Sequence, residues 1–232
     1  AARLEGLPEY PFAAYAREIG RLVTAGHDVI RLDVGNPDLP PHDQVIKALV
    51  SAAQRDNTHG YGGYRGSPRL RKAFAAYYGR RFNVELEPER EILPLIGSKD
   101  GITHIALALL DPGDVVLVPD PGYPAYARSA LLAGATPYYV KLDPTSNYFP
   151  RLDALPLDVV KRAKMLWVNY PHNPTTATAT REQLEELVQF CSDHTILLCS
   201  DNPYADIVFD EFEPPSILEI RGASEVAVEF YS

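Results

Sequence analysis

Asp201 stands where a buried strand is expected to end. The stretch CSDNPYADIVFD, residues 199–210, follows the apolar run TILL and carries Asp201 and, three residues later, Tyr204. An unpaired carboxylate is costly to bury, so Asp201 should either face water in a turn or meet a cation held at the end of the strand. The segment alone leaves both interpretations open, because aspartate is also common in solvated turns.

Three further turns carry a polar or aromatic residue directly after an apolar run. Ser98 is expected to cap the helical pattern KDGITHIALALL, where free N–H groups favour an anion such as phosphate. Tyr123, in DPGYPAY, could cover a planar ligand. Asn173 precedes Pro174 and should project from an extended turn. A plain cap, a core aromatic and an ordinary turn explain each one singly, but four such ends in one sheet favour a ligand-binding crevice.

The apolar runs that precede these turns predict the strands that position them. They are continuous rather than alternating, as in a parallel sheet whose two faces are both covered by helices. We therefore predict an α/β fold with three α/β/α layers and a mostly parallel sheet, in which ligands collect at the carboxyl ends of the strands. The predicted strands are residues 91–97, 114–119, 136–141, 164–169, 195–200 and 226–231.

Helices are predicted between these strands. One begins with Ser67 as N-cap and Pro68 as the first helical residue. Another begins with the capping-box pair Thr180 and Gln183. The apolar faces expected to be buried are Leu70, Ala73, Phe74 and Tyr77 in the first helix, Ile102, Ile105, Ala106 and Leu109 in the helix after Ser98, and Leu184, Leu187, Val188 and Cys191 in the helix after Thr180.

Composition narrows the class of partner. The 232 residues carry a formal net charge of −9, which argues against nucleic acid or an anionic membrane. No stretch has the ~18 to 20 apolar residues of a membrane span, and the start AARLEGLPEY lacks the features of a signal peptide, so a cytoplasmic location is expected. Cys191 and Cys199 suit neither a zinc site nor a redox pair and are expected to be buried thiols, and no metal is expected.

Together these motifs resemble the PLP-dependent aminotransferases of fold type I, class I/II. The resemblance covers essentially the whole chain, and within the family it is most similar to the branch that holds LL-diaminopimelate and related aspartate or aromatic aminotransferases. The motifs that carry it are YPFAAYAREI, VIRLDVGNPDLPP, YGGYRGSPRLRKAF, GSKDGI, DPGYPAY, NYPHNPTTA, SDNPYADIVFD and VEFYS.

The resemblance implies a division of the chain into domains. Residues 1–40 would form an N-terminal arm and a segment joining the small domain. Residues 41–232 would form an incomplete large domain that binds pyridoxal phosphate, and the small C-terminal domain would be absent.

The resemblance also implies a role for each residue at the strand ends, with pyridoxal 5′-phosphate as the cofactor. Asp201 would pair with the protonated pyridine nitrogen and so keep the ring an electron sink when the substrate loses its α-proton. The other implied contacts are Tyr123 stacked on the ring, Asn173 and Tyr204 hydrogen-bonded to its O3′ oxygen, and Ser98 with Lys99 at the phosphate.

Further implied roles concern the phosphate and the substrate. Ser232 would begin a second phosphate-binding segment. Tyr61, or Tyr64 if the register differs, would reach the phosphate of the neighbouring subunit in a homodimer. Gly35 would let its backbone approach the substrate carboxylate, and Tyr10 would line the same pocket across the dimer.

The chain departs from the family pattern in two places. The family commonly has Asn-Pro-Thr-Gly where this chain has Thr176 in place of the glycine. The family's Schiff-base lysine lies just after the position of Ser232 and its substrate-carboxylate arginine lies further on, so no catalytic residue is expected within this chain. We expect the sequence to be a fragment, inactive as a transaminase by itself and poorly soluble because of an exposed sheet edge.

The expected activity is transfer of an amino group between an amino acid and a 2-oxo acid, within amino acid metabolism. A PLP-dependent β-eliminating carbon–sulfur lyase would use nearly the same residues and remains an alternative. A non-catalytic, aminotransferase-like ligand-sensing module is a third possibility, although such proteins usually carry a basic helix-turn-helix segment, which the sequence lacks. A dinucleotide-binding enzyme is disfavoured because no G-x-G-x-x-G follows a predicted strand.

Overall fold

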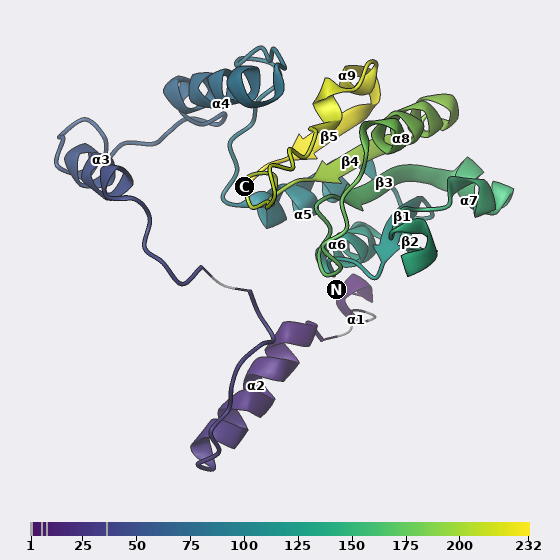
Figure 1. The fold of residues 1–232 in the computed structure, drawn as a ribbon, viewed down its shortest axis with the longest axis horizontal. Coiled ribbons are helices and arrows are strands. Elements are labelled where there is room, and N and C mark those ends of the chain that lie inside the picture. The colour runs from purple at the N-terminus through teal and green to yellow at the C-terminus, as the bar shows by residue number, and fades with distance from the viewer. Residues whose placement is uncertain (1, 6, 8, 36) are drawn as a thin grey trace. The chain divides into compact units, whose positions relative to one another are not determined.

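The computed structural model describes every residue except 1, 6, 8 and 36. It contains two compact units, one formed by Ala1–Glu5 with Arg65–Ser232 and the other by Gly6–Tyr64 (Figure 1). The predicted division near residue 40 falls inside the second unit, and the assignment of 1–40 and 41–232 to an arm and a large domain stays a prediction.

The unit of residues 6–64 is built from helices and connecting loops. Helix α2 (Pro11–Thr24) begins at a proline, which lacks the N–H that a first helical residue leaves unpaired. Helix α3 (Asp43–Ala53) is capped by His42, whose ring nitrogen accepts the N–H of Gln44 at 3.2 Å. Tyr10, Gly35 and Tyr61, predicted to act in substrate and phosphate binding, all belong to this unit.

The larger unit is organised around one parallel sheet. Its strands lie in the order β2-β1-β3-β4-β5, and every neighbouring pair is parallel. This arrangement confirms five of the six predicted strands and the predicted parallel sheet. The strands are β1 (Val115–Asp120), β2 (Thr136–Lys141), β3 (Ala163–Asn169), β4 (Leu197–Asp201) and β5 (Ala227–Phe230).

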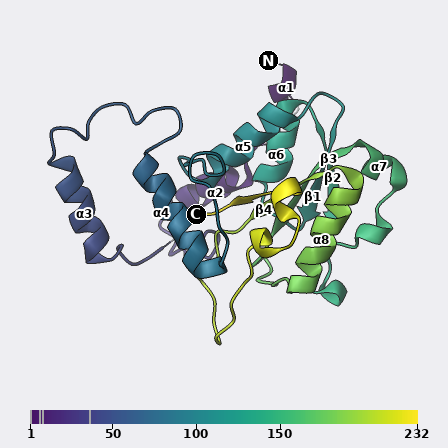
Figure 2. The same ribbon diagram turned by 90° about the horizontal axis from the view of Figure 1, so that it is seen from above.

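Helices cover both faces of the sheet, as Figures 1 and 2 show. The helices of this unit are α1 (Ala2–Glu5), α4 (Pro68–Phe82), α5 (Ser98–Leu109), α6 (Ala125–Ala133), α7 (Leu157–Arg162), α8 (Arg181–His194) and α9 (Ala223–Val226), with short 3-10 turns η1 (Pro144–Ser146), η2 (Leu152–Ala154) and η3 (Ile217–Glu219).

Two hydrophobic clusters lie against the sheet, one on each face, because successive strand residues point to opposite sides, and a smaller cluster of described residues gathers Tyr78 and Phe82 of α4 with Ala205. On one face, the strands pack against α5 and α6 through Val116, Val118, Met165, Trp167 and Cys199. On the other face, they pack against α7, α8 and α9 through Leu117, Leu166, Val168 and Leu198. The predicted three-layer α/β/α architecture is therefore confirmed.

The predicted strand at 91–97 is wrong. None of the described residues pairs with this segment, and it runs into the turn that starts α5. Leu95 lies close to Gly101 in α5, whereas Leu93 and Ile96 are exposed. A strand also needs a neighbouring strand that pairs with its backbone N–H and C=O groups, and an apolar run in the sequence does not predict that neighbour.

Helix α4 is present as predicted, but it buries a different face. Leu70 is 44% exposed, whereas Arg71, Tyr78 and Phe82 are buried. Arg71 donates to both carboxylate oxygens of Glu89, at 2.9 and 2.7 Å, and to nearby backbone carbonyls. A hydrophobic pattern misses this face because the residue that anchors it near the N-terminus of the helix is the buried Arg71, which pairs with the exposed carboxylate of Glu89.

The other helix starts agree more closely with the sequence. Thr180 and Gln183 form the predicted capping box of α8, and its whole predicted stripe is buried. At α5 the prediction is wrong by one position, because Gly97 occupies the N-cap with φ of 81° and Ser98 is the first helical residue. Glycine adopts this conformation without steric cost, so the helix begins at Ser98, one residue earlier than predicted.

Gly101 lets α5 approach the sheet closely. A Cβ atom at this position would lie 2.4 Å from Cδ1 of Leu95 and 2.7 Å from Cε1 of Phe230. We predict that Gly101→Ala lowers the free energy of unfolding by about 1 to 3 kcal/mol, since an overpacked core must shift. Gly79→Ala is the matched control in α4, where the nearest atom lies at 4.0 Å, and should raise stability by roughly 0.5–1 kcal/mol. Urea unfolding measures both, and a loss of stability in both variants would contradict the packing explanation.

Thr176 adopts a backbone conformation that favours glycine. Its φ is 62°, and its N–H donates to the His172 carbonyl at 2.7 Å, so the turn keeps a left-handed residue although this chain carries threonine there. A residue with a Cβ atom lowers the stability of the folded state by about 1–2 kcal/mol when it adopts the left-handed conformation. Glycine avoids this cost, but about 0.5–1 kcal/mol of the gain is offset because glycine loses more chain entropy on folding.

We therefore predict that Thr176→Gly raises the free energy of unfolding by about 0.5–1 kcal/mol, which thermal unfolding would detect as a rise of about 2 °C. Thr178→Gly, two residues further on and outside the left-handed region, is the control and should lower stability instead. Equal effects of the two substitutions would contradict the backbone explanation.

Candidate functional site

Asp201 ends β4 and is buried, with 5% of its surface exposed. The Tyr126 hydroxyl donates to its Oδ2 at 2.6 Å, while Oδ1 is buried and has no hydrogen-bond partner within the described part of the chain. Burial raises the pKa of Asp201 to about 6, and the bond from Tyr126 opposes that rise. Asp201 therefore does not lie in a solvated turn, and one of its oxygens is available to a donor.

Tyr126 is a site residue that sequence reasoning missed. It lies at the start of α6, and its ring stacks on Trp167 with centroids 4.7 Å apart and planes 9° from parallel. Trp167 packs in turn against Phe230 at 5.3 Å, so aromatic contacts hold the tyrosine beneath Asp201. The signal in the sequence was its spacing of three residues from Tyr123, which puts both rings on one side of a helix start.

Tyr123 and Lys99 lie together, although they come from different elements. The Lys99 ammonium lies 5.6 Å from the centre of the Tyr123 ring, and the Tyr123 and Tyr126 rings meet edge-on at 5.6 Å. Ser98 is the first residue of α5 and is half-buried. The helix start and the lysine both carry positive charge, so this corner suits an anionic group beside an aromatic face.

Asn173 and Tyr204 are brought together from the ends of β3 and β4. The Asn173 amide donates to the Tyr204 hydroxyl oxygen at 3.3 Å. Asn169, the last residue of β3, donates to the Asp201 carbonyl at 2.7 Å and accepts the Asn173 N–H at 2.7 Å. Sequence reasoning missed Asn169, whose only signal was a polar residue closing an apolar strand. It ties the Asn173 turn to the strand end that bears Asp201.

The remaining predicted site residues lie elsewhere. Tyr10, Gly35 and Tyr61, as well as the alternative Tyr64, belong to the unit of residues 6–64, which has no determined position relative to Asp201. Ser232 follows β5 directly after Tyr231 and is exposed. The roles proposed for these residues stay predictions.

The strand-end residues suit one kind of ligand. Asp201 Oδ1 calls for a donor that is preferably cationic, because a positive charge would offset the cost of burying the carboxylate. Tyr123 offers an aromatic face, Asn173 and Tyr204 offer polar groups, and the start of α5 offers a positive corner. A planar ring with a protonated nitrogen and an anionic substituent fits this set.

Within the described ranges, no group of three or more His, Cys, Asp or Glu side chains is arranged to hold a metal ion. Cys191 and Cys199 are free and buried, as predicted, and burial raises the pKa of Cys191 to about 12. Among the described residues, no helix is both long and apolar enough to span a membrane.

Asp201 should make the stability of the cofactor-free protein depend on pH. Between the ordinary aspartate pKa near 4 and the folded value of about 6, the folded protein keeps a proton that the unfolded protein has released. Stability should therefore fall as pH rises through this window, by about 2–3 kcal/mol in total.

We predict that Asp201→Asn removes this loss. The free energy of unfolding of the variant, measured relative to that of wild type, should therefore be higher at pH 7.5 than at pH 4. Urea unfolding at the two pH values measures the difference, with Asp210→Asn at an exposed position as the control for charge removal. A stability difference between Asp201→Asn and wild type that is the same at both pH values would contradict the buried, unpaired carboxylate.

Comparison with known proteins places this geometry in a family. The model for aminotransferase class I and II matches residues 27–229. The LL-diaminopimelate aminotransferase of Dehalococcoides mccartyi is 46% identical over 99% of this chain, and the protein of the same name from Aquifex aeolicus is 45% identical over the same share. The chain spans 59% of the length of each of these relatives.

Solved structures agree. A substrate-bound BacF structure from Bacillus subtilis superposes with a TM-score of 0.93 at 34% identity, covering 100% of this chain and 58% of that one. A variant of the Thermus thermophilus aspartate aminotransferase superposes with a TM-score of 0.91 at 27% identity, covering 100% and 59%. The strand-end site, the sheet that carries it and these matches together show that the chain belongs to the aminotransferase class I and II family.

Proposed function

We propose that this chain is the cofactor-binding part of a pyridoxal 5′-phosphate-dependent aminotransferase. The observation that carries the proposal is the buried Oδ1 of Asp201 at the end of β4, which has no hydrogen-bond partner among the described residues. The chain spans 59% of the length of its relatives, so activity, substrates and assembly concern the longer protein.

Bound pyridoxal phosphate would supply an electron-accepting ring that stabilises the negative charge left when an amino acid loses its α-proton. Asp201 would hold the proton on the ring nitrogen, because an ionised carboxylate favours a cation beside it. Tyr126 supports this role, since its hydrogen bond to Oδ2 favours the ionised form of Asp201. The pairing would also offset the cost of burying the carboxylate.

The other residues would orient the ring. Tyr123 would lie against its face, and Tyr204 would donate to the ring oxygen, since the bond from Asn173 leaves the Tyr204 hydroxyl hydrogen free to do so. Ser98 and Lys99 at the start of α5 would hold the phosphate, together with Ser232. Each of these assignments agrees with the chemistry of the side chain, and none involves a residue that releases or accepts the substrate's proton.

The longer protein would act as a homodimer on an amino acid and a 2-oxo acid, with Gly35 and Tyr10 at the substrate and Tyr61 at the neighbouring phosphate. Its relatives' name makes LL-diaminopimelate the first amino donor to assay. The two free cysteines suit the reducing cytoplasm, where we propose that it works. A carbon–sulfur lyase would use the same cofactor contacts, so products must separate the two.

The test is cofactor binding and product formation by the full-length protein. Wild type should bind pyridoxal phosphate and convert LL-diaminopimelate or glutamate with a 2-oxo acid into the exchanged pair. Asp201→Ala should bind the cofactor at least about tenfold more weakly and lose nearly all turnover, because the ring nitrogen loses its only charged partner.

Asp210→Asn controls for the loss of a negative charge at an exposed position and should resemble wild type. Cystathionine is the control substrate, and release of a thiol and a 2-oxo acid from it, without amino transfer, would favour the lyase. Wild-type turnover in Asp201→Ala would refute the role given to Asp201.

A further inference from the structure

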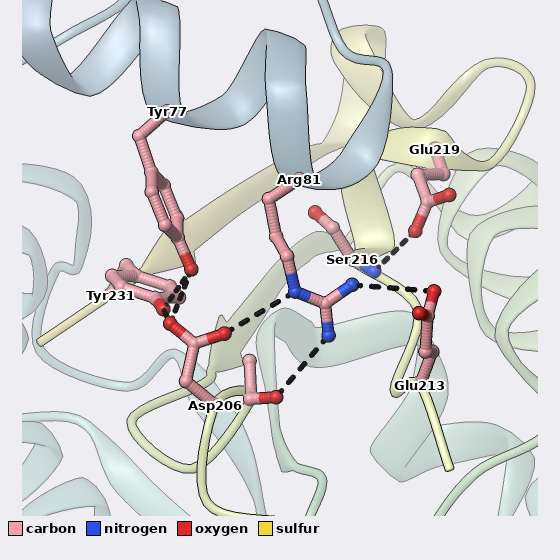
Figure 3. Close-up of polar contacts among 8 residues, drawn as sticks. Tyr77, Arg81, Asp206, Glu213, Ser216, Glu219 and Tyr231 are labelled. Atoms are coloured by element: carbon pink, nitrogen blue, oxygen red, sulfur yellow. Dashed lines mark hydrogen bonds and ion pairs between the residues drawn. The ribbon is translucent and has the colours of Figure 1, made fainter. Parts of the chain in front are cut away.

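A second polar cluster lies beside the site, formed by Tyr77 and Arg81 of α4, Asp206 and Tyr231 (Figure 3). We call these four residues the Asp206 clamp. The Tyr77 and Tyr231 hydroxyls both donate to Oδ2 of Asp206, at 2.5 and 2.6 Å, and the two hydroxyl oxygens also touch. Arg81 Nε lies 3.3 Å from the other oxygen, Oδ1. One carboxylate therefore accepts from three donors that come from two separate parts of the chain, helix α4 and the segment after β5.

The donor geometry requires an ionised carboxylate at this position. A hydroxyl has one hydrogen, so Tyr77 and Tyr231 use theirs on Oδ2 and have none left for each other. The bond from Tyr231, followed by that from Tyr77, holds the pKa of Asp206 below its usual range. An amide could not replace it, because turning its oxygen to the two hydroxyls would turn its NH₂ group to Arg81.

The clamp joins two segments that the proposed function brings to one ligand. Asp206 lies two residues after Tyr204, and the Ile207 N–H donates to the Tyr204 carbonyl at 3.0 Å, so both belong to one turn. Tyr231 directly precedes Ser232 and follows Phe230, whose carbonyl accepts the Asn202 N–H at 2.8 Å. Asp206 therefore connects the turn that carries Tyr204 to the segment that carries Ser232.

Helix α4 supplies the fixed side of the clamp. The Tyr77 ring packs against Tyr231 at 5.2 Å, and Phe82 lies within 6.4 Å of both rings. Arg81 also donates to the Ala205 carbonyl at 3.4 Å. Its contact with the exposed Glu213, at 3.7 Å, is a surface ion pair of the kind that contributes little. The two short hydrogen bonds from Tyr77 and Tyr231 to Oδ2 of Asp206 therefore fix the geometry of the cluster more than the ion pair does.

We propose that Asp206 is a positioning residue for the cofactor. Through its bond to Tyr231 it sets the distance between Tyr204, at the ring oxygen, and Ser232, at the phosphate. The inference rests on the proposed function, because both ends of the clamp act on the same bound molecule. Asp206 itself touches neither that molecule nor the substrate.

The experiment compares four variants of the full-length protein. Asp206→Asn and Tyr231→Phe break the link, whereas Glu213→Gln removes a carboxylate that faces the same Arg81 but meets neither tyrosine. Tyr77→Phe removes one of the two hydroxyls on Oδ2 and leaves the Tyr231 bond in place. The dissociation constant of pyridoxal phosphate, the pH midpoint of the bound cofactor's absorbance and the thermal midpoint are measured for each.

Asp206→Asn and Tyr231→Phe should each weaken cofactor binding about tenfold, the equivalent of one lost hydrogen bond to a charged group. They should also raise the pH midpoint of the absorbance by about half a unit, because a displaced Tyr204 stabilises the deprotonated ring oxygen less well. Glu213→Gln should stay within about twofold of wild type in affinity, and Tyr77→Phe should lose less affinity than Tyr231→Phe because the bond from Tyr231 to Asp206 remains.

The outcomes separate this inference from the proposed function. If wild type binds no pyridoxal phosphate, the proposed function fails and the clamp has nothing to position. If wild type binds it and both Asp206→Asn and Tyr231→Phe keep its affinity and pH midpoint, the clamp is structural only and the inference is overturned. Tyr231→Phe decides the matter if Asp206→Asn does not fold, since it keeps the aromatic ring. Equal losses in Tyr77→Phe and Tyr231→Phe would also overturn it.

Discussion

The structure is arranged around one buried carboxylate oxygen that has no hydrogen-bond partner in the described part of the chain. Asp201 is held at the end of β4 among Tyr126, Trp167 and the ends of the neighbouring strands, where only 5% of its surface is exposed. Burial at such a place favours the neutral acid, and only a donor or a cation restores the charge. Burying the ionised carboxylate of Asp201 therefore destabilises the protein without a ligand, and a cation beside Oδ1 would offset that cost.

Glu229 in β5 shows how the same fold treats a carboxylate that needs no ligand. Its oxygens accept from the hydroxyls of Tyr78 and Ser216, at 2.8 and 2.7 Å, and from the Ile217 N–H at 3.1 Å. Burial raises its pKa, but these bonds oppose the rise. Glu229 pairs in register with Ser200, one residue before Asp201, so the two carboxylates point to opposite faces of the sheet. The protein satisfies one carboxylate internally and leaves an oxygen of the other unpaired.

Polar side-chain bonds tie the ends of the strands together in addition to the sheet ladder. Asn169 connects β3 to the Asn173 turn and to the Asp201 carbonyl, and the Asp206 clamp connects the Tyr204 turn to the end of β5. The backbone nearby adopts a left-handed conformation at Thr176, where glycine would be easier. Such a conformation persists when surrounding contacts determine it, which is consistent with turns whose shape serves a ligand.

The sequence by itself determined the class of fold, five of the strands, the capping box of α8 and the polar residues at the strand ends. Each of these follows from local chemistry: apolar runs, cap residues and turn residues act over a few positions along the chain. Only the tertiary structure decided that 91–97 is not a strand, that α4 buries Arg71 instead of Leu70, and that Tyr126, Asn169 and Asp206 form hydrogen bonds with distant residues around the strand ends. These facts depend on which distant groups meet, because a hydrogen bond across 75 residues, such as that from Tyr126 to Asp201, leaves no periodic trace in the sequence.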